Sequence, residues 1–345
     1  MGDAVGIGPE IIARAAAAGA TGGCVVIGDV QVLRRAARLF GDGLPLAEVA
    51  SPADADALPP GCLAVCPPPG LPPGLEQLPW GRIDARCGAA AAACIEAAVR
   101  WLQQGAAAGL VTAPLHKEAL AAAGVGFPGH TEMLQALATA PGAAPPPVRM
   151  MLANDELRVV LVTIHVALRR AIEQVTFDAV LQTLRIAQAA AQGWGEARPR
   201  IAVAGLNPHA GEGGLFGDEE RTIIAPAIAA ARALGIDASG PYAPDTVFMR
   251  ARHAPGHPGE FDLVVAMTHD HGLIPVKYLG VAHGVNVTLG LPFVRTSPDH
   301  GTAFDIAGRG SADPSSLKAA IAHARRLAGA PSRDPQGASD GAGPG

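Results

Sequence analysis

Short apolar runs alternate with longer segments of helical periodicity along most of the 345 residues. Runs of about four to eight apolar residues bounded by turn-forming residues are typical of buried strands, and apolar residues recurring every three or four positions are typical of helices. The expected strands are 24–27, 63–66, 109–112, 148–152, 157–164, 201–206, 263–267 and 285–289. The expected helices are 9–18, 31–40, 86–104, 131–138, 178–192, 218–234 and 314–327. The alternation predicts an α/β fold.

The length allows either two subdomains or one large α/β unit. Asn154 and Asp155 separate two apolar runs, which predicts an antiparallel hairpin and therefore a mixed rather than purely parallel sheet. Residues 150–161 would then form an edge of the sheet or an arm that reaches another subunit. The proline-rich segments 67–79 and 141–147 are expected to be stiff loops, which suit joints between subdomains.

Composition excludes several classes of protein. The net charge is -5 and no basic cluster interleaves with aromatic residues, which argues against nucleic-acid binding. No apolar stretch is long enough to cross a membrane and the first residues lack the features of a signal peptide, so a cytoplasmic enzyme is the default expectation. The five cysteines lack CxxC spacing and are expected to be buried thiols. Residues 330–345 have no bulky apolar side chain and are expected to be disordered.

Three of the expected strands are each followed within a few residues by a histidine, namely His165, His209 and His269. In open α/β sheets, ligands collect beyond the carboxyl ends of the strands. If the three imidazoles converge, they hold a divalent metal ion and leave positions open for a substrate, which is the arrangement of a catalytic site. The alternative is that each histidine caps its strand and bonds to nearby backbone.

Two further segments begin a helix in a way that could bind an anionic ligand. The segment GHTE puts His130 and Thr131 where free backbone N–H groups favour a phosphate or carboxylate, so both are candidate substrate contacts. The alternative there is an ordinary helix cap at Thr131. The opening segment GDAVGIGPEII is a similar entry, for which an ordinary tight turn is favoured over an anion site. The acidic residues 218–220 are interpreted as a helix start rather than a metal cluster.

The segment THDHGLIPVK carries polar residues after the third of these strands. We interpret it as an extended loop, in which neighbouring side chains point in different directions, so only one of His269 and His271 needs to bind a metal. His269 is favoured because it follows the strand sooner. Asp270 is a candidate to orient an imidazole. Lys277 is of interest because the chain otherwise uses arginine almost throughout, although a solvated surface lysine is the alternative.

Residues 284–308 present Asn286, Arg295 and Asp299 on an expected strand, loop and helix. The planar guanidinium of Arg295 suits a phosphate or a carboxylate, and the alternative is a surface ion pair. No glycine-rich dinucleotide fingerprint, phosphate-binding P-loop, zinc-protease motif or serine-hydrolase motif occurs. A dinucleotide would therefore not be held by an ordinary fingerprint, and the sequence does not identify cofactor-binding residues.

Taken together, these segments resemble the 4-hydroxythreonine-4-phosphate dehydrogenase family of vitamin B6 biosynthesis, in order and across nearly the whole chain. The similar segments are GDAVGIGPE, APLHKEAL, FPGHTE, TIHVAL, GLNPHAGEGG, GPYAPDTVF, AMTHDHGL, GVNVTLGLP and RTSPDHGTAFDIAGRG. The resemblance implies two α/β/α subdomains with a mixed, mostly parallel sheet, as in isocitrate and isopropylmalate dehydrogenases. It also implies a homodimer with shared active sites. We predict a first subdomain over 1–120 and 290–329, and a second, with the dimer contacts, over 121–289.

The resemblance also implies roles for individual residues. One divalent ion (zinc, magnesium or cobalt) would bind to His165, His209 and His269, with one of the three histidines supplied by the partner subunit. The implied substrate contacts are His130, Thr131, Lys277, Asn286 and Arg295. Lys277 and Asp270 are the predicted catalytic residues, and the group that takes the hydroxyl proton stays open.

The implied reaction is oxidation of a secondary alcohol by NAD or NADP followed by loss of carbon dioxide, which converts 4-phosphohydroxy-L-threonine to 3-amino-2-oxopropyl phosphate. Two segments depart from the family: its GDPAG opening is GDAVG here, without the strand that should precede it, and its YHDQ is THDH. The second change leaves open the same chemistry on phosphothreonate, phosphoerythronate or a cis-dihydrodiol. The sequence also leaves open a metal-dependent phosphohydrolase and a catalytically inactive dimer.

Overall fold

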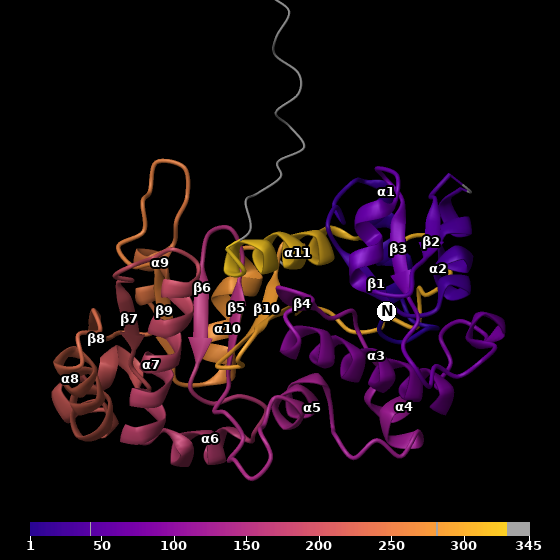
Figure 1. The fold of residues 1–345 in the computed structure, drawn as a ribbon. Coiled ribbons are helices and arrows are strands. Elements are labelled where there is room, and N and C mark those ends of the chain that lie inside the picture. Colours follow the sequence, from indigo (N-terminus) through magenta and orange to yellow (C-terminus); the bar gives the residue numbers. More distant parts are fainter. Residues whose placement is uncertain (42, 281, 330–345) are drawn as a thin grey trace, which may run out of the picture. The chain divides into compact units, whose positions relative to one another are not determined.

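The computed structural model describes residues 1–41, 43–280 and 282–329. It divides into two compact units. Among the described residues, unit 1 comprises Met1–Gly109, Ala113–Gly126 and 302–329, and unit 2 comprises Leu110–Thr112 and Phe127–Gly301. Each unit combines strands with helices (Figure 1), so the predicted α/β class is confirmed. The tail predicted to be disordered, 330–345, lies outside the described residues.

Unit 1 is built on a small parallel sheet. Its strands, within the described chain, are β1 (Val25–Ile27), β2 (Leu46–Glu48) and β3 (Leu63–Cys66), in the order β1-β3-β2. Its helices are α1 (Gly8–Ala17), α2 (Val30–Ala37), α3 (Ala85–Gln103), α4 (Lys117–Ala122) and α11 (Ser315–Leu327), with shorter 3-10 turns at Arg38–Phe40, Pro52–Ala57 and Leu75–Gln77. Helices α3 and α4 pack closely at Gly88, which has no side chain. A Cβ atom at this position would lie 2.0 Å from the carbonyl oxygen of Ala119.

Unit 2 carries the larger sheet. Among the described residues, eight strands follow the order β4-β11-β10-β5-β6-β9-β7-β8. The strands are β4 (Gly109–Val111), β5 (Arg149–Ala153), β6 (Arg158–Leu161), β7 (Ile201–Ala204), β8 (Ala238–Tyr242), β9 (Leu263–Ala266), β10 (Val285–Leu289) and β11 (Val294–Pro298). The helices are α5 (His130–Leu137), α6 (Leu168–Gln174), α7 (Phe177–Gly193), α8 (Ala225–Ala233), α9 (Val247–Ala251) and α10 (His269–Tyr278), with a 3-10 turn at Pro208–Gly214 and a π-helical turn at Glu220–Ile224.

The sheet of unit 2 is mixed, as predicted. Strands β6, β9, β7 and β8 are parallel, whereas β5, β10 and β11 join it through antiparallel pairs. The predicted hairpin is confirmed, because Met151 lies opposite Val160 across its turn. The prediction that residues 150–161 form an edge or an arm is wrong. Strand β5 lies between β10 and β6, and the full burial of Leu152 and Val159 is typical of interior strands.

Helices cover both faces of this sheet. On one face, Arg149 of β5 donates from Nε to the Thr183 hydroxyl of α7 at 2.7 Å. On the other face, Leu152 of β5 belongs to the same buried cluster as Leu273 and Val276 of α10; Figure 1 shows α7 and α10 on opposite sides of the strands. Helix α10 approaches the strands closely, since a Cβ atom at Gly272 would lie 2.4 Å from Cδ2 of Leu161. The small residue at this position therefore sets the distance between α10 and the sheet.

The prediction that THDHGLIPVK is an extended loop is wrong, because residues 269–278 form α10. Gly272 and Pro275 both disfavour a helix, and together they conceal the helical pattern in the sequence. Burial of Leu273 and Val276 against the sheet outweighs these local preferences. His269 is therefore the first residue of a helix and has a defined direction.

The cysteines agree with the prediction in part. All five are free thiols; Cys66, Cys87 and Cys94 are buried, and Cys24 and Cys62 are half-buried. Over the ranges that the structure describes, no helix combines the length and the apolar character needed to cross a membrane.

Candidate active site

Two of the three predicted histidines come together at the ends of neighbouring parallel strands. Strands β6 and β9 pair in parallel, and the pairing continues beyond them, where Thr163 donates from its backbone and its hydroxyl to the carbonyl of Met267 at 3.2 and 2.8 Å. His165 and His269 each follow two residues later. Their ring centroids lie 5.4 Å apart, with the ring planes inclined by 49°. The strand register therefore brings these two imidazoles together.

A carboxylate orients one of these imidazoles. Nδ1 of His269 lies 2.8 Å from Oδ1 of Asp270. When Nδ1 carries the proton and donates it to this carboxylate, Nε2 presents its lone pair to a metal ion. This is the contact expected of Asp270, although the Asp270 side chain itself is exposed.

His209 lies away from this pair within one copy of the chain. It follows β7 on the turn Pro208–Gly214, it is exposed, and its ring packs 6.2 Å from that of Phe216. Across the described residues, no group of three histidine, cysteine, aspartate or glutamate side chains is arranged to hold a metal. One copy thus brings together two imidazole side chains, a donor type that suits a divalent transition metal, but not a set of three.

Arg295 is a buried cation rather than a surface residue. It lies on β11 and is 4% exposed. Its two terminal nitrogens donate to the hydroxyls of Thr288 at 2.9 Å and Thr112 at 2.7 Å, while its Nε has no partner. No carboxylate among the described residues forms an ion pair with it, and burial lowers the pKa of the guanidinium to about 10. The alternative of a surface ion pair is therefore wrong.

An uncompensated buried guanidinium favours an anionic ligand. Keeping such a charge away from water costs several kcal/mol, of the order of 2 to 5, unless an anion approaches it. Asn286 lies on the same face as Thr288, because alternate residues of a strand share a face. Antiparallel pairing of β10 with β11 places Arg295 on that face as well. The sheet thus presents an amide and a fixed cation together.

His130 is at the beginning of α5, close enough to Arg295 for the positive charge to act on its imidazole. The preceding Gly129 makes no side-chain cap, and α5 begins at His130, so the alternative that Thr131 caps the helix is wrong. Burial, followed by the positive charge of Arg295, holds the pKa of His130 well below its ordinary value of 6.5. At neutral pH the imidazole is therefore neutral and can exchange a hydrogen bond with an anion that Arg295 attracts.

The depressed pKa of His130 leads to a prediction about stability. The unfolded chain takes up a proton near pH 6.5 while the folded chain resists it, so folding stability falls as the pH is lowered below 6.5. We expect His130→Gln to reduce this loss, by at most about 1.4 kcal/mol per pH unit. Chemical denaturation of both proteins between pH 7.5 and about 5 measures the difference. Parallel curves for the two proteins would contradict the depressed pKa.

Lys277 is held by a carboxylate. It lies in the last turn of α10, and its ammonium pairs with Oδ2 of Asp299, which follows β11. The Lys277 side chain is 41% exposed, so it lies at the surface and is also paired with a carboxylate. Helix α10 covers the face of the sheet on which Leu152 lies, and Asn286 is the register partner of Leu152. Lys277 and Arg295 accordingly belong to the same face of unit 2.

Sequence reasoning missed three residues that shape the site. Thr112 and Thr288 hold Arg295 through their hydroxyls, but threonine is so common in strands that no sequence signal marks these two. Glu220 has the sequence context of a helix start, yet its carboxylate is buried. The signal that could have identified it is the distance of a few residues between an acidic run and the glycine-rich loop that carries His209.

Comparisons with known proteins show the family to which the chain belongs. They define the class first: the similar proteins are dehydrogenases, and this chain is an enzyme of that class. The chain belongs to the family described as pyridoxal phosphate biosynthetic protein PdxA, whose model matches residues 21–324.

Individual relatives cover nearly the whole chain. A 4-hydroxythreonine-4-phosphate dehydrogenase of Beijerinckia indica is 54% identical over 329 residues, which is 95% of this chain and 93% of the relative. A D-threonate 4-phosphate dehydrogenase of Pectobacterium atrosepticum is 44% identical and covers 95% and 98% of the two chains. The crystal structure of a 4-hydroxythreonine-4-phosphate dehydrogenase from Klebsiella pneumoniae matches with a TM-score of 0.84 and 44% identity, over 95% and 96% of the two chains.

Proposed function

We propose that this chain oxidises the secondary alcohol of 4-phosphohydroxy-L-threonine with NAD or NADP and releases carbon dioxide, yielding 3-amino-2-oxopropyl phosphate. The observation that carries the proposal is the buried Arg295 guanidinium, which is held by two hydroxyls and compensated by no carboxylate among the described residues. Such a group selects an anionic substrate. The Beijerinckia and Pectobacterium relatives, at 54 and 44% identity, supply the reaction class.

In this proposal some residues bind the substrate through charge and others through hydrogen bonds. Arg295 and Lys277 hold the anionic ends of the substrate, and Asp299 directs the Lys277 ammonium. The neutral imidazole of His130 and the side chains of Thr131 and Asn286 bond to the remaining polar groups. Arg295 and Lys277 are oriented by their partners before the substrate arrives, so binding costs little of their side-chain conformational entropy.

The metal ligands in this proposal are His165 and His269 of one copy and His209 of a second copy. An all-imidazole donor set suits zinc or cobalt better than magnesium. When bound, the ion supplies electrophilic stabilisation of the negative charge that develops on the substrate oxygen. The contribution of the protein is the orientation of the imidazoles, in which Asp270 fixes the ring of His269.

The surroundings of His209 support a homodimer. Leu215 and Phe216, on the same loop, are 73% and 48% exposed. An exposed apolar pair beside an isolated imidazole suits a surface that a second copy of the chain covers. The proposed dimer therefore completes each metal site across the interface.

The reaction balances with a nicotinamide cofactor as the oxidant. When bound, the cofactor would accept the hydride of the carbinol C–H bond, and the hydroxyl proton would pass to a base. The bond to the carboxylate then breaks, carbon dioxide departs, and the electron pair remains on the carbon next to the new ketone until a proton arrives. Asp270 and Lys277 are the candidate groups of this chain for the two proton transfers.

A substrate screen tests the proposal. Full-length protein loaded with Zn²⁺ or Co²⁺ is assayed for reduction of NAD and of NADP with 4-phosphohydroxy-L-threonine, D-threonate 4-phosphate, phosphoerythronate and a cis-dihydrodiol. We expect the highest kcat/KM with 4-phosphohydroxy-L-threonine. Higher activity on D-threonate 4-phosphate, the substrate named for the Pectobacterium relative, would support the proposed reaction class but contradict the proposed substrate. Release of inorganic phosphate without cofactor reduction would overturn the proposal in favour of a phosphohydrolase.

A further inference from the structure

The loop that carries His209 has a left-handed backbone. Six consecutive residues have positive φ: His209 at 53°, Ala210 at 52°, Gly211 at 79°, Glu212 at 42°, Gly213 at 68° and Gly214 at 105°. Three of them are not glycine, and each such residue costs about 1 to 2 kcal/mol in this region. A left-handed run of this length persists only where surrounding contacts determine it, so the loop requires a specific support.

Glu220 provides that support. Its carboxylate is buried, with 5% of the residue exposed. Oε1 accepts the backbone N–H groups of Leu206 and Asn207, both at 2.7 Å, and Oε2 accepts the Asn207 side-chain amide at 2.9 Å. Three donors thus converge on one carboxylate immediately before the left-handed turn begins.

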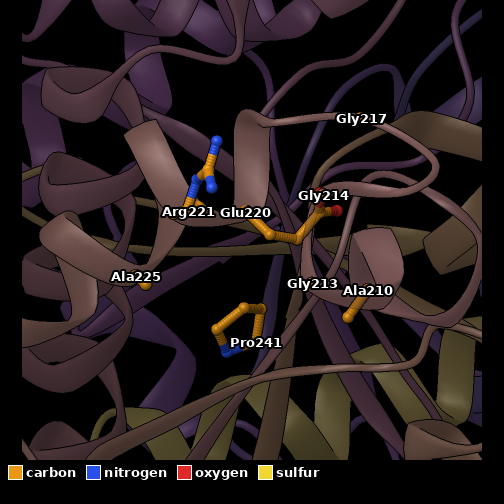
Figure 2. Close-up of a pocket in the computed structure, with 8 residues that line it drawn as sticks. All are labelled: Ala210, Gly213, Gly214, Gly217, Glu220, Arg221, Ala225 and Pro241. Atoms are coloured by element: carbon orange, nitrogen blue, oxygen red, sulfur yellow. The ribbon is translucent and has the colours of Figure 1, made fainter.

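The loop also closes on this carboxylate from its far end. Cβ atoms at Gly205 and Gly211 would lie 3.1 Å from Oε1 and 2.8 Å from Oε2, so the backbone on both sides of His209 approaches the carboxylate closely. Figure 2 shows the Glu220 side chain extending toward the glycine-rich loop around Gly213 and Gly214, at one wall of a pocket of about 210 Å³. Glu220 begins the π-helical turn Glu220–Ile224, a rare geometry that is often found at functional sites.

We infer that Glu220 is a positioning residue that fixes the direction of the His209 imidazole before a metal ion arrives. The inference rests on the proposed role of His209 as a metal ligand. The carboxylate does not touch the ion; it acts through the backbone of Leu206 and Asn207 and through the loop that folds back over it. Residues that orient a metal ligand in this way typically contribute 10- to 100-fold in metal affinity.

The test compares Glu220→Gln with Glu219→Gln in the full-length protein. Glutamine keeps the shape of Glu220 but replaces an acceptor oxygen with an N–H donor facing the other donors. Glu219 is a matched control because it contacts the same Asn207 amide, at 2.7 Å, whereas the backbone N–H groups of Leu206 and Asn207 donate to Glu220. Co²⁺ serves as the probe, with its affinity measured by titration calorimetry and its ligand field by visible absorption. The melting temperature of the metal-free protein is recorded separately.

We expect Glu220→Gln to weaken Co²⁺ binding at least about tenfold and to alter the Co²⁺ spectrum, whereas Glu219→Gln stays within about twofold of the parent. A lower melting temperature with unchanged Co²⁺ affinity would overturn the inference, since it would reduce Glu220 to a structural residue. If Glu220→Gln does not fold, Asn207→Ala takes its place; it removes the amide contacts to Oε2 of Glu220 and to Oε2 of Glu219, and Glu219→Gln accounts for the second of these. A loss of about threefold or more then supports the inference, and unchanged affinity overturns it.

His209→Ala separates this inference from the function on which it rests. Loss of Co²⁺ affinity in His209→Ala together with an unaltered Glu220→Gln overturns the positioning role alone. Unchanged Co²⁺ affinity in His209→Ala overturns the proposed ligand set, and the positioning inference with it.

Discussion

His269→Ala is expected to release the bound metal and to lower kcat/KM about 1,000-fold or more, while His271→Ala retains both. His269 is the residue whose ring lies 5.4 Å from that of His165 and whose Nδ1 contacts Asp270. Stabilisation of a developing charge by a metal ion is worth several kcal/mol, and about 4 kcal/mol corresponds to a factor of about 1,000 in rate. His271 lies on the same helix, is exposed, and is the matched control.

Metal content after dialysis, measured by elemental analysis, and steady-state kinetics with NAD and NADP check this expectation. Treatment of the parent protein with a chelator is expected to abolish turnover, and added Zn²⁺ or Co²⁺ to restore it. Full activity in the chelated parent would contradict metal participation. Equal losses in the two histidine variants would indicate general disruption of α10 rather than the removal of a ligand.

The sequence identifies the strands of this fold well where they are buried on both faces. The apolar run 63–66 is a strand over those residues in the structure, and the run 263–267 contains the strand Leu263–Ala266, because a continuous apolar run has few alternatives inside an α/β core. The same logic places His165 and His269 at the carboxyl ends of their strands. Their approach to each other depends on the pairing of β6 with β9, which is a contact between residues about a hundred positions apart.

Elements whose stability comes from distant contacts are not visible in the sequence. Helix α10 contains Gly272 and Pro275 and is held by the sheet beneath it. The segment 150–161 has the pattern of any hairpin, and only the order of strands in the sheet shows that it is interior. The sequence of strand β11 has the polar composition of a loop, because its buried residues include Arg295 and Thr296. Local propensity is a weak guide wherever tertiary packing supplies most of the energy.

In the candidate site, too, the sequence predicts residue types but not the tertiary contacts that position them. Residue types and spacing suggest Arg295 as an anion contact, but its burial and its two threonine partners follow from the pairing of β10 and β11. Glycines at 211 and 213 predict positive φ at those positions, but not that His209 and Glu212 share it. That conformation depends on Glu220, whose role follows from three hydrogen bonds and not from a motif.

Arg295→Met is expected to lower kcat/KM about 100-fold or more, chiefly through a higher KM, and yet to leave the melting temperature unchanged or raised. Loss of a buried, charge-assisted contact to an anion costs about 3 kcal/mol, which corresponds to at least a factor of 100. The folded protein, by contrast, no longer has to bury an uncompensated guanidinium, whose cost already appears as the pKa of about 10. Activity and stability therefore change independently, which is typical of a residue retained for function.

Arg170→Met is the control for this change. Arg170 is an exposed arginine on α6 that pairs with Glu173 across one helical turn, so its replacement is expected to shift neither activity nor melting temperature measurably. Inorganic phosphate supplies a second readout, because it is expected to raise the melting temperature of the parent and of Arg170→Met but not of Arg295→Met. A lower melting temperature in Arg295→Met with unchanged KM would mean that the guanidinium stabilises the sheet and does not bind the substrate anion. In that case the substrate anion would have to be held elsewhere, with Lys277 as the remaining candidate cation on this face of the sheet among the described residues.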